Sequence, residues 1–91
     1  MKPPRPFSGP DYHENAAACA PGEEPCVLCG EPLRTAKYEA HVVAGGAEFA
    51  TGDTPFNEDD AGDMGWYFVG PECARKIPLA YRSAVPASAV R

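Results

Sequence analysis

The stretch Cys26-Val27-Leu28-Cys29-Gly30 decides the fold of this chain, because it places two thiols on one tight turn. Two sulfurs at this spacing reach a single tetrahedral ion, at metal–sulfur distances of about 2.3 Å for zinc. Gly30 supplies the backbone freedom that such a turn requires. The pattern therefore predicts a metal-binding knuckle, and we expect the ordered part of the chain to begin near Cys26.

A third thiol, Cys73, follows the dipeptide Pro71-Glu72, which is typical of a helix start. Proline suits the first helical turn, and an acidic residue complements the positive end of the helix dipole. The free backbone N–H groups at a helix start also stabilise a thiolate. We therefore expect Cys73 to join Cys26 and Cys29 as a ligand of one structural zinc ion.

The fourth ligand is predicted to be His41. This residue lies on an expected strand, 37–43, which passes near the knuckle in this layout, and three cysteines with one histidine are a common ligand set. Cys19 is the alternative, if the N-terminal segment folds back across seven residues. His13, a carboxylate or a water molecule also remain open. The competing interpretation of His41 is an ordinary strand histidine on a solvated face.

The apolar content supports a metal-stabilised domain. Val, Leu, Ile and Phe together supply only about 15% of the 91 residues, below the roughly 20% at which disorder becomes a concern. A chain of this size and composition needs a disulfide, a metal or a partner to fold. A thioredoxin-like redox pair would be followed by a helix, whereas Gly30 and Pro32 follow here. Metal binding is therefore the preferred interpretation of the cysteines.

The chain is predicted to divide into a Pro-rich flexible arm (1–25), a zinc-binding domain (26–82) and a flexible tail (83–91). Alternation of apolar residues predicts strands, and Gly45-Gly46 predicts a hairpin turn between two of them. The expected order is a knuckle, strands 37–43 and 47–51, a polar loop 52–64, a strand 66–69 and a helix 72–77. The fold class is thus a small α+β domain of the treble-clef or zinc-ribbon kind. Its predicted core consists of Leu28, Leu33, Tyr38, Val42, Phe49, Trp66, Phe68 and Ile77.

Charge argues against a general nucleic-acid binder, because the formal net charge is −5. The polar loop carries five of the acidic residues: Asp53, Glu58, Asp59, Asp60 and Asp63. A short basic stripe, Arg75, Lys76 and Arg82, leaves a local contact with nucleic acid as an alternative. No signal peptide or membrane span is evident, so we expect a cytoplasmic protein that does not contact a membrane.

Catalytic motifs are not recognised. The chain has only two histidines, no Ser/His/Asp arrangement and no Gly-rich phosphate loop. A zinc hydrolase, with one coordination position left to water, is the remaining enzymatic alternative. We expect a non-enzyme.

The segments Cys26-Val-Leu-Cys29-Gly-Glu-Pro-Leu and Gly65-Trp-Tyr-Phe-Val-Gly-Pro-Glu-Cys73-Ala-Arg-Lys, with His41 between them, resemble small zinc-binding proteins of actinobacteria and their phages. The resemblance covers roughly residues 26–77 and implies a zinc site without an assigned activity. We therefore expect a protein-interaction module, a phage or actinobacterial accessory factor that binds a host protein through an acidic surface in the host cytoplasm.

Overall fold

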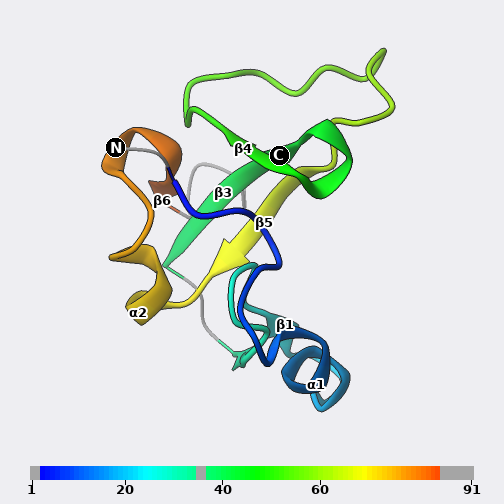
Figure 1. Ribbon diagram of the computed structural model, residues 1–91, viewed down its shortest axis with the longest axis vertical. Coiled ribbons are helices and arrows are strands. Elements are labelled where there is room, and N and C mark those ends of the chain that lie inside the picture. The colour runs from blue at the N-terminus through cyan, green and yellow to red at the C-terminus, as the bar shows by residue number, and fades with distance from the viewer. Residues whose placement is uncertain (1–2, 35–36, 85–91) are drawn as a thin grey trace.

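The computed structural model describes residues 3–34 and 37–84, which form a small α+β structure with two antiparallel sheets and short helices (Figure 1). Two of the short helices are of the 3-10 type. In chain order the elements are α1 (Tyr12–Ala17), β1 (Glu24–Pro25), β2 (Pro32–Leu33), β3 (Tyr38–Val43), the 3-10 turn η1 (Ala44–Gly46), β4 (Glu48–Ala50), β5 (Gly65–Val69), α2 (Pro71–Ala74), the 3-10 turn η2 (Leu79–Tyr81) and β6 (Ser83–Ala84).

The larger sheet is built around β3. Strand β5 pairs with one edge of β3, and β4 and β6 pair with different parts of its other edge, all of them antiparallel. The predicted strands and the hairpin are therefore present. Gly45 and Gly46 both have positive φ, +66° and +99°, which explains why glycines occupy this turn.

Both faces of β3 are covered. Ala40 and Val42 belong to the hydrophobic core, and Glu39 and His41 point to the opposite face of the sheet, as period two requires. All four are buried, with at most 1% of their surface exposed. The interpretation of His41 as a residue on a solvated face is therefore wrong, because the loop between β4 and β5 folds over that face.

Strand β5 faces the core with Tyr67 and Val69, and not with the predicted residues Trp66 and Phe68. Val69 is fully buried and Tyr67 packs against the core, whereas Trp66 and Phe68 are half-buried and lie outside the core cluster. Trp66 stacks instead on His41, with ring centroids 4.2 Å apart. The prediction that Trp66 and Phe68 are core residues is therefore wrong.

The segment from Phe7 to Ala18 packs on the knuckle. The N–H groups of Phe7 and Gly9 donate to the carbonyls of Val27 and Leu28, at 2.7 and 2.9 Å. Figure 1 shows this segment crossing in front of the sheet and leading into α1, beside β1. The division into arm, domain and tail stays a prediction, and residues 85–91 of the expected tail lie outside the described residues.

Among the described residues, no helix has both the length and the apolar character needed to cross a membrane.

Candidate metal centre

The knuckle is the turn that joins β1 to β2. The N–H of Cys26 donates to the carbonyl of Glu31 at 2.9 Å, and the N–H of Gly30 donates to the carbonyl of Cys26 at 2.8 Å. Gly30 has a φ of +80°, and a Cβ at this position would lie only 2.4 Å from the carbonyl oxygen of Tyr12. Glycine is therefore required here both by the turn and by the close approach of α1.

The start of α2 brings the third thiol to the knuckle. Pro71 occupies the first helical turn, and Cys73 follows on the buried side of the helix. The helix ends at Ala74, three residues earlier than predicted. The N–H of Gly70, immediately before the helix, donates to Sγ of Cys26 at 3.3 Å. This hydrogen bond joins the two halves of the site.

Three sulfurs meet at this junction. The Sγ atoms of Cys26, Cys29 and Cys73 all lie within 4.8 Å of one another. A tetrahedral zinc ion with bonds of about 2.3 Å holds its sulfurs about 3.8 Å apart, so small side-chain movements are enough to accommodate one ion. All four cysteines of the chain are free thiols. The cluster can therefore bind a metal.

The protonation of the three thiols is set by burial and by nearby N–H groups. Burial raises the pKa of Cys26, but N–H groups of Cys29, Gly70 and Leu28 outweigh it, so that the net pKa is lowered. Burial, followed by repulsion from Cys26, raises the pKa of Cys73 to about 12. The backbone is therefore arranged to hold a thiolate at Cys26, and a metal would displace a proton from Cys73.

His41 does not belong to this cluster. Tyr38 pairs with Val69, next to the site, and His41 lies three residues farther along β3, at about 3.3 Å per residue. It also points to the face of the sheet away from the core, in which Cys26 and Cys73 are buried. The structure therefore gives no support to His41 as a zinc ligand.

His41 instead anchors the acidic loop, residues 51–64 between β4 and β5, to the sheet. Its Nε2 lies 2.6 Å from Oδ1 of Asp63, and its Nδ1 lies 3.1 Å from the carbonyl oxygen of Thr54. The side chain of His41 is fully buried, and that of Asp63 is 3% exposed. Asp63 also accepts hydrogen bonds from the N–H groups of Asn57 and Gly65. No sequence pattern distinguished Asp63 from the other acidic residues of this loop.

Cys19, the alternative fourth ligand, is also outside the cluster. Its Sγ lies 3.8 Å from the carbonyl oxygens of Asn15 and Gly30. Because it contacts a carbonyl of the knuckle and none of the three sulfurs, it supports the backbone of the turn. His13 lies on α1, exposed and stacked edge-on against Tyr12.

The N-terminal segment completes the hydrogen bonds of the knuckle. Besides the two backbone bonds to Val27 and Leu28, Nδ2 of Asn15 donates to the carbonyl of Cys29 at 2.9 Å. With Cys19 beside the Gly30 carbonyl, each of four consecutive carbonyl groups has a partner from residues 7–19. Buried carbonyls without partners are costly, so this segment stabilises the turn that carries two of the candidate ligands.

The predicted basic stripe is not continuous. Arg75 and Lys76 are exposed immediately after α2, and Arg75 makes a long, exposed ion pair with Glu72 at 4.0 Å. Arg82 instead covers the ring of Tyr38, 5.2 Å from its centroid, with its Nε buried. Only the first two residues therefore form a shared charged surface.

The structure thus defines a small α+β protein with a cluster of three cysteines able to bind a metal. No protein-family model, curated protein or solved structure matches the chain.

Proposed function

We propose that this protein is a zinc-stabilised interaction module that binds another protein through its acidic loop. The observation that carries the metal part is the meeting of Cys26, Cys29 and Cys73 at the junction of the knuckle and α2. Thiolates at this spacing favour zinc among the abundant ions. Zinc then supplies folding free energy that a thin apolar core lacks.

The order of elements supports a treble-clef-like arrangement. A knuckle carries the first pair of ligands, a hairpin follows, and a helix start carries the next ligand. The resemblance to small zinc proteins of actinobacteria and phages fits the same order. We place the protein in the cytoplasm, because a reducing compartment keeps such thiols available for metal.

The acidic loop, residues 51–64, is the proposed binding surface. Figure 1 shows it projecting beyond β4 and β5, at the end of the molecule opposite α1 and the knuckle. Phe56 is 50% exposed on this loop. Glu58 and Asp59 are exposed and make no ion pair within the described residues. An exposed aromatic ring beside free carboxylates fits a partner that has a basic surface with an apolar pocket.

The test is a quantitative capture from host lysate with the zinc-loaded protein as bait. We expect one stoichiometric protein partner, whose recovery falls at least tenfold with Phe56→Ala and with the double substitution Glu58→Gln/Asp59→Asn. Asp60 is left intact, because its carboxylate accepts a hydrogen bond from the N–H of Gly62 and supports the loop.

The matched control is the double substitution Asp11→Asn/Glu14→Gln, which removes the same charge from exposed positions at the other end of the molecule. Capture that is equal for all variants, or lost equally in the control, would contradict the loop as the binding surface.

Nucleic-acid binding is the weaker alternative, because Arg82 is engaged with Tyr38 and only Arg75 and Lys76 stay available. It predicts binding that weakens steeply with salt.

A further inference from the structure

We infer that the metal centre leaves one coordination position for a sulfur donor from outside the folded chain. This inference rests on the proposed zinc site and names the chemistry that completes it. The donor is a thiolate, supplied by a small thiol.

The first observation concerns the residues of the chain that are able to bind a metal. Every Cys, His, Asp and Glu of the sequence lies within the described residues 3–34 and 37–84. Among them, Cys26, Cys29 and Cys73 form the one group in which three or more potential ligand atoms meet. Structural zinc sites are four-coordinate, so three protein ligands leave one position to be filled.

The two expected donors are held elsewhere by their own contacts. Both ring nitrogens of His41 already have partners, Asp63 and Thr54, on the far face of β3. Sγ of Cys19 faces the carbonyls of Asn15 and Gly30. Moving either one to the cluster would break buried or half-buried hydrogen bonds, so neither is available without local unfolding.

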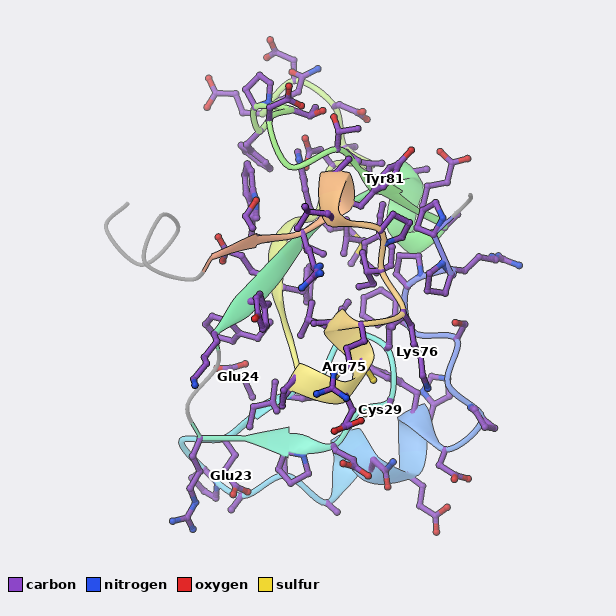
Figure 2. The ribbon with its side chains drawn as sticks, turned by 90° about the vertical axis from the view of Figure 1, so that its left-hand side faces the viewer. Glu23, Glu24, Cys29, Arg75, Lys76 and Tyr81 are labelled. Atoms are coloured by element: carbon purple, nitrogen blue, oxygen red, sulfur yellow. The ribbon has the colours of Figure 1, made fainter. Side chains whose placement is uncertain are left out.

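The exposure of the three thiols locates the open side. Cys26 is fully buried and Cys73 is 6% exposed, whereas Cys29 is half-buried. In Figure 2, Cys29 lies below α2, and Arg75 and Lys76 follow the end of this helix. A ligand therefore reaches the centre past Cys29, the most exposed of the three thiols, below a segment that carries Glu72, Arg75 and Lys76.

The charge of the zinc-loaded centre opposes an anionic donor, and cations next to α2 reduce that opposition. Three thiolates and Zn²⁺ sum to a charge of about −1, and a fourth thiolate would bring it to about −2. The exposed cations Arg75 and Lys76 offset part of this repulsion, and Arg75 contributes less because it also pairs with Glu72 at 4.0 Å. Four sulfur ligands are also a common complete set for zinc. Binding would involve no redox change: the thiol would lose its proton to solvent, and its sulfur would take the coordination position that a water molecule would otherwise fill.

The experiment uses the full chain loaded with one equivalent of Co²⁺, whose visible spectrum reports the number of sulfur ligands. Dilute protein is titrated with 2-mercaptoethanol. We expect a saturable increase and shift of the ligand-field bands as a fourth sulfur binds. Arg75→Gln and Lys76→Gln should each raise the titration midpoint by up to about fivefold, and Arg5→Gln, a control near the other end of the chain, should not.

A dilution series without added thiol tests the competing source, Cys19 of a second copy of this chain. A four-sulfur spectrum that fades on dilution and is lost with Cys19→Ser would overturn the assignment to a small thiol, whereas a response only to added thiol supports it. A cobalt spectrum that changes neither with added thiol nor with dilution would overturn the inference and would leave the proposed metal centre intact. Absence of any cobalt spectrum would overturn the metal centre and the inference with it.

Discussion

At the scale of single residues, Gly30 links the knuckle to the N-terminal segment. Its φ of +80° disfavours any side chain, and α1 leaves no space for one. Backbone strain alone costs about 1–2 kcal/mol at such a position. We predict that Gly30→Ala lowers the free energy of unfolding of the zinc-loaded protein by more than this amount, because the new Cβ also clashes with α1. Urea denaturation measures this difference.

The matched comparison is Gly45→Ala. Gly45 has a similar positive φ, +66°, but a Cβ there meets no atom within 4 Å. It should therefore show the strain of about 1–2 kcal/mol without the clash. Equal losses for the two variants would mean that α1 does not pack on Gly30 as described.

A second residue-scale prediction concerns Asp63. Burial acts to raise its pKa, but the N–H of Asn57 and the ring of His41 outweigh it, so that the pKa lies below the ordinary 3.8. A carboxyl with a lowered pKa contributes stability above its unfolded pKa and loses it as the pH falls through the folded value. The stability gap between wild type and Asp63→Asn should thus be full at neutral pH and close below about pH 3.8.

Urea denaturation across this pH range tests the prediction. Asp59→Asn, a change at an exposed neighbour, should leave stability unaltered at every pH. A gap that persists unchanged at the lowest pH would show that Asp63 acts through packing and not through its charge.

At the scale of elements, residues 7–19 act as part of the folded unit. We predict that the amides of Phe7 and Gly9 exchange hydrogen at least tenfold more slowly than in an unfolded peptide, because both donate to the knuckle. The amide of Ser8 lies between them, makes no hydrogen bond among the described residues and should exchange rapidly. Rapid hydrogen exchange at all three amides would contradict this packing and would support the prediction, made from composition, that residues 1–25 form a flexible arm.

The main strands of the larger sheet and the start of α2 could be predicted from the sequence, whereas α1, β1, β2, η2 and β6 were not. Alternation identified β3, the Gly45-Gly46 pair identified the hairpin turn, and Pro71 identified the start of α2. These signals are local, because each depends on the conformational preferences of a few neighbouring residues. The position of residues 7–19 could not be predicted, since it depends on hydrogen bonds to carbonyls 11 to 20 residues away in the sequence.

The candidate site was predictable in part for the same reason. The spacing of Cys26 and Cys29 and the helix start at Cys73 identify three ligands that the structure brings together. The prediction of His41 rested on an expected strand that passes near the knuckle and on the frequency of sites with three cysteines and one histidine. The alternation of His41 with Val42 along β3 instead places its side chain on the face away from the core.

At the scale of the whole molecule, the cluster of three cysteines and the acidic loop lie at opposite ends of the molecule (Figure 1). The proposed zinc at one end would therefore stabilise the fold and leave the loop at the other end accessible to the proposed partner. Removal of the metal by a chelator should unfold the chain and abolish binding together, because the core alone is too small to hold the sheet.

The most direct test of the account is the zinc content of the intact chain by native mass spectrometry, for wild type, Cys73→Ser, His41→Gln and Cys19→Ser. The account predicts one zinc ion per chain in the wild type, its loss with Cys73→Ser, and its retention with His41→Gln and Cys19→Ser. Absence of zinc from the wild type, or its loss with His41→Gln while the chain stays folded, would contradict a centre built on Cys26, Cys29 and Cys73.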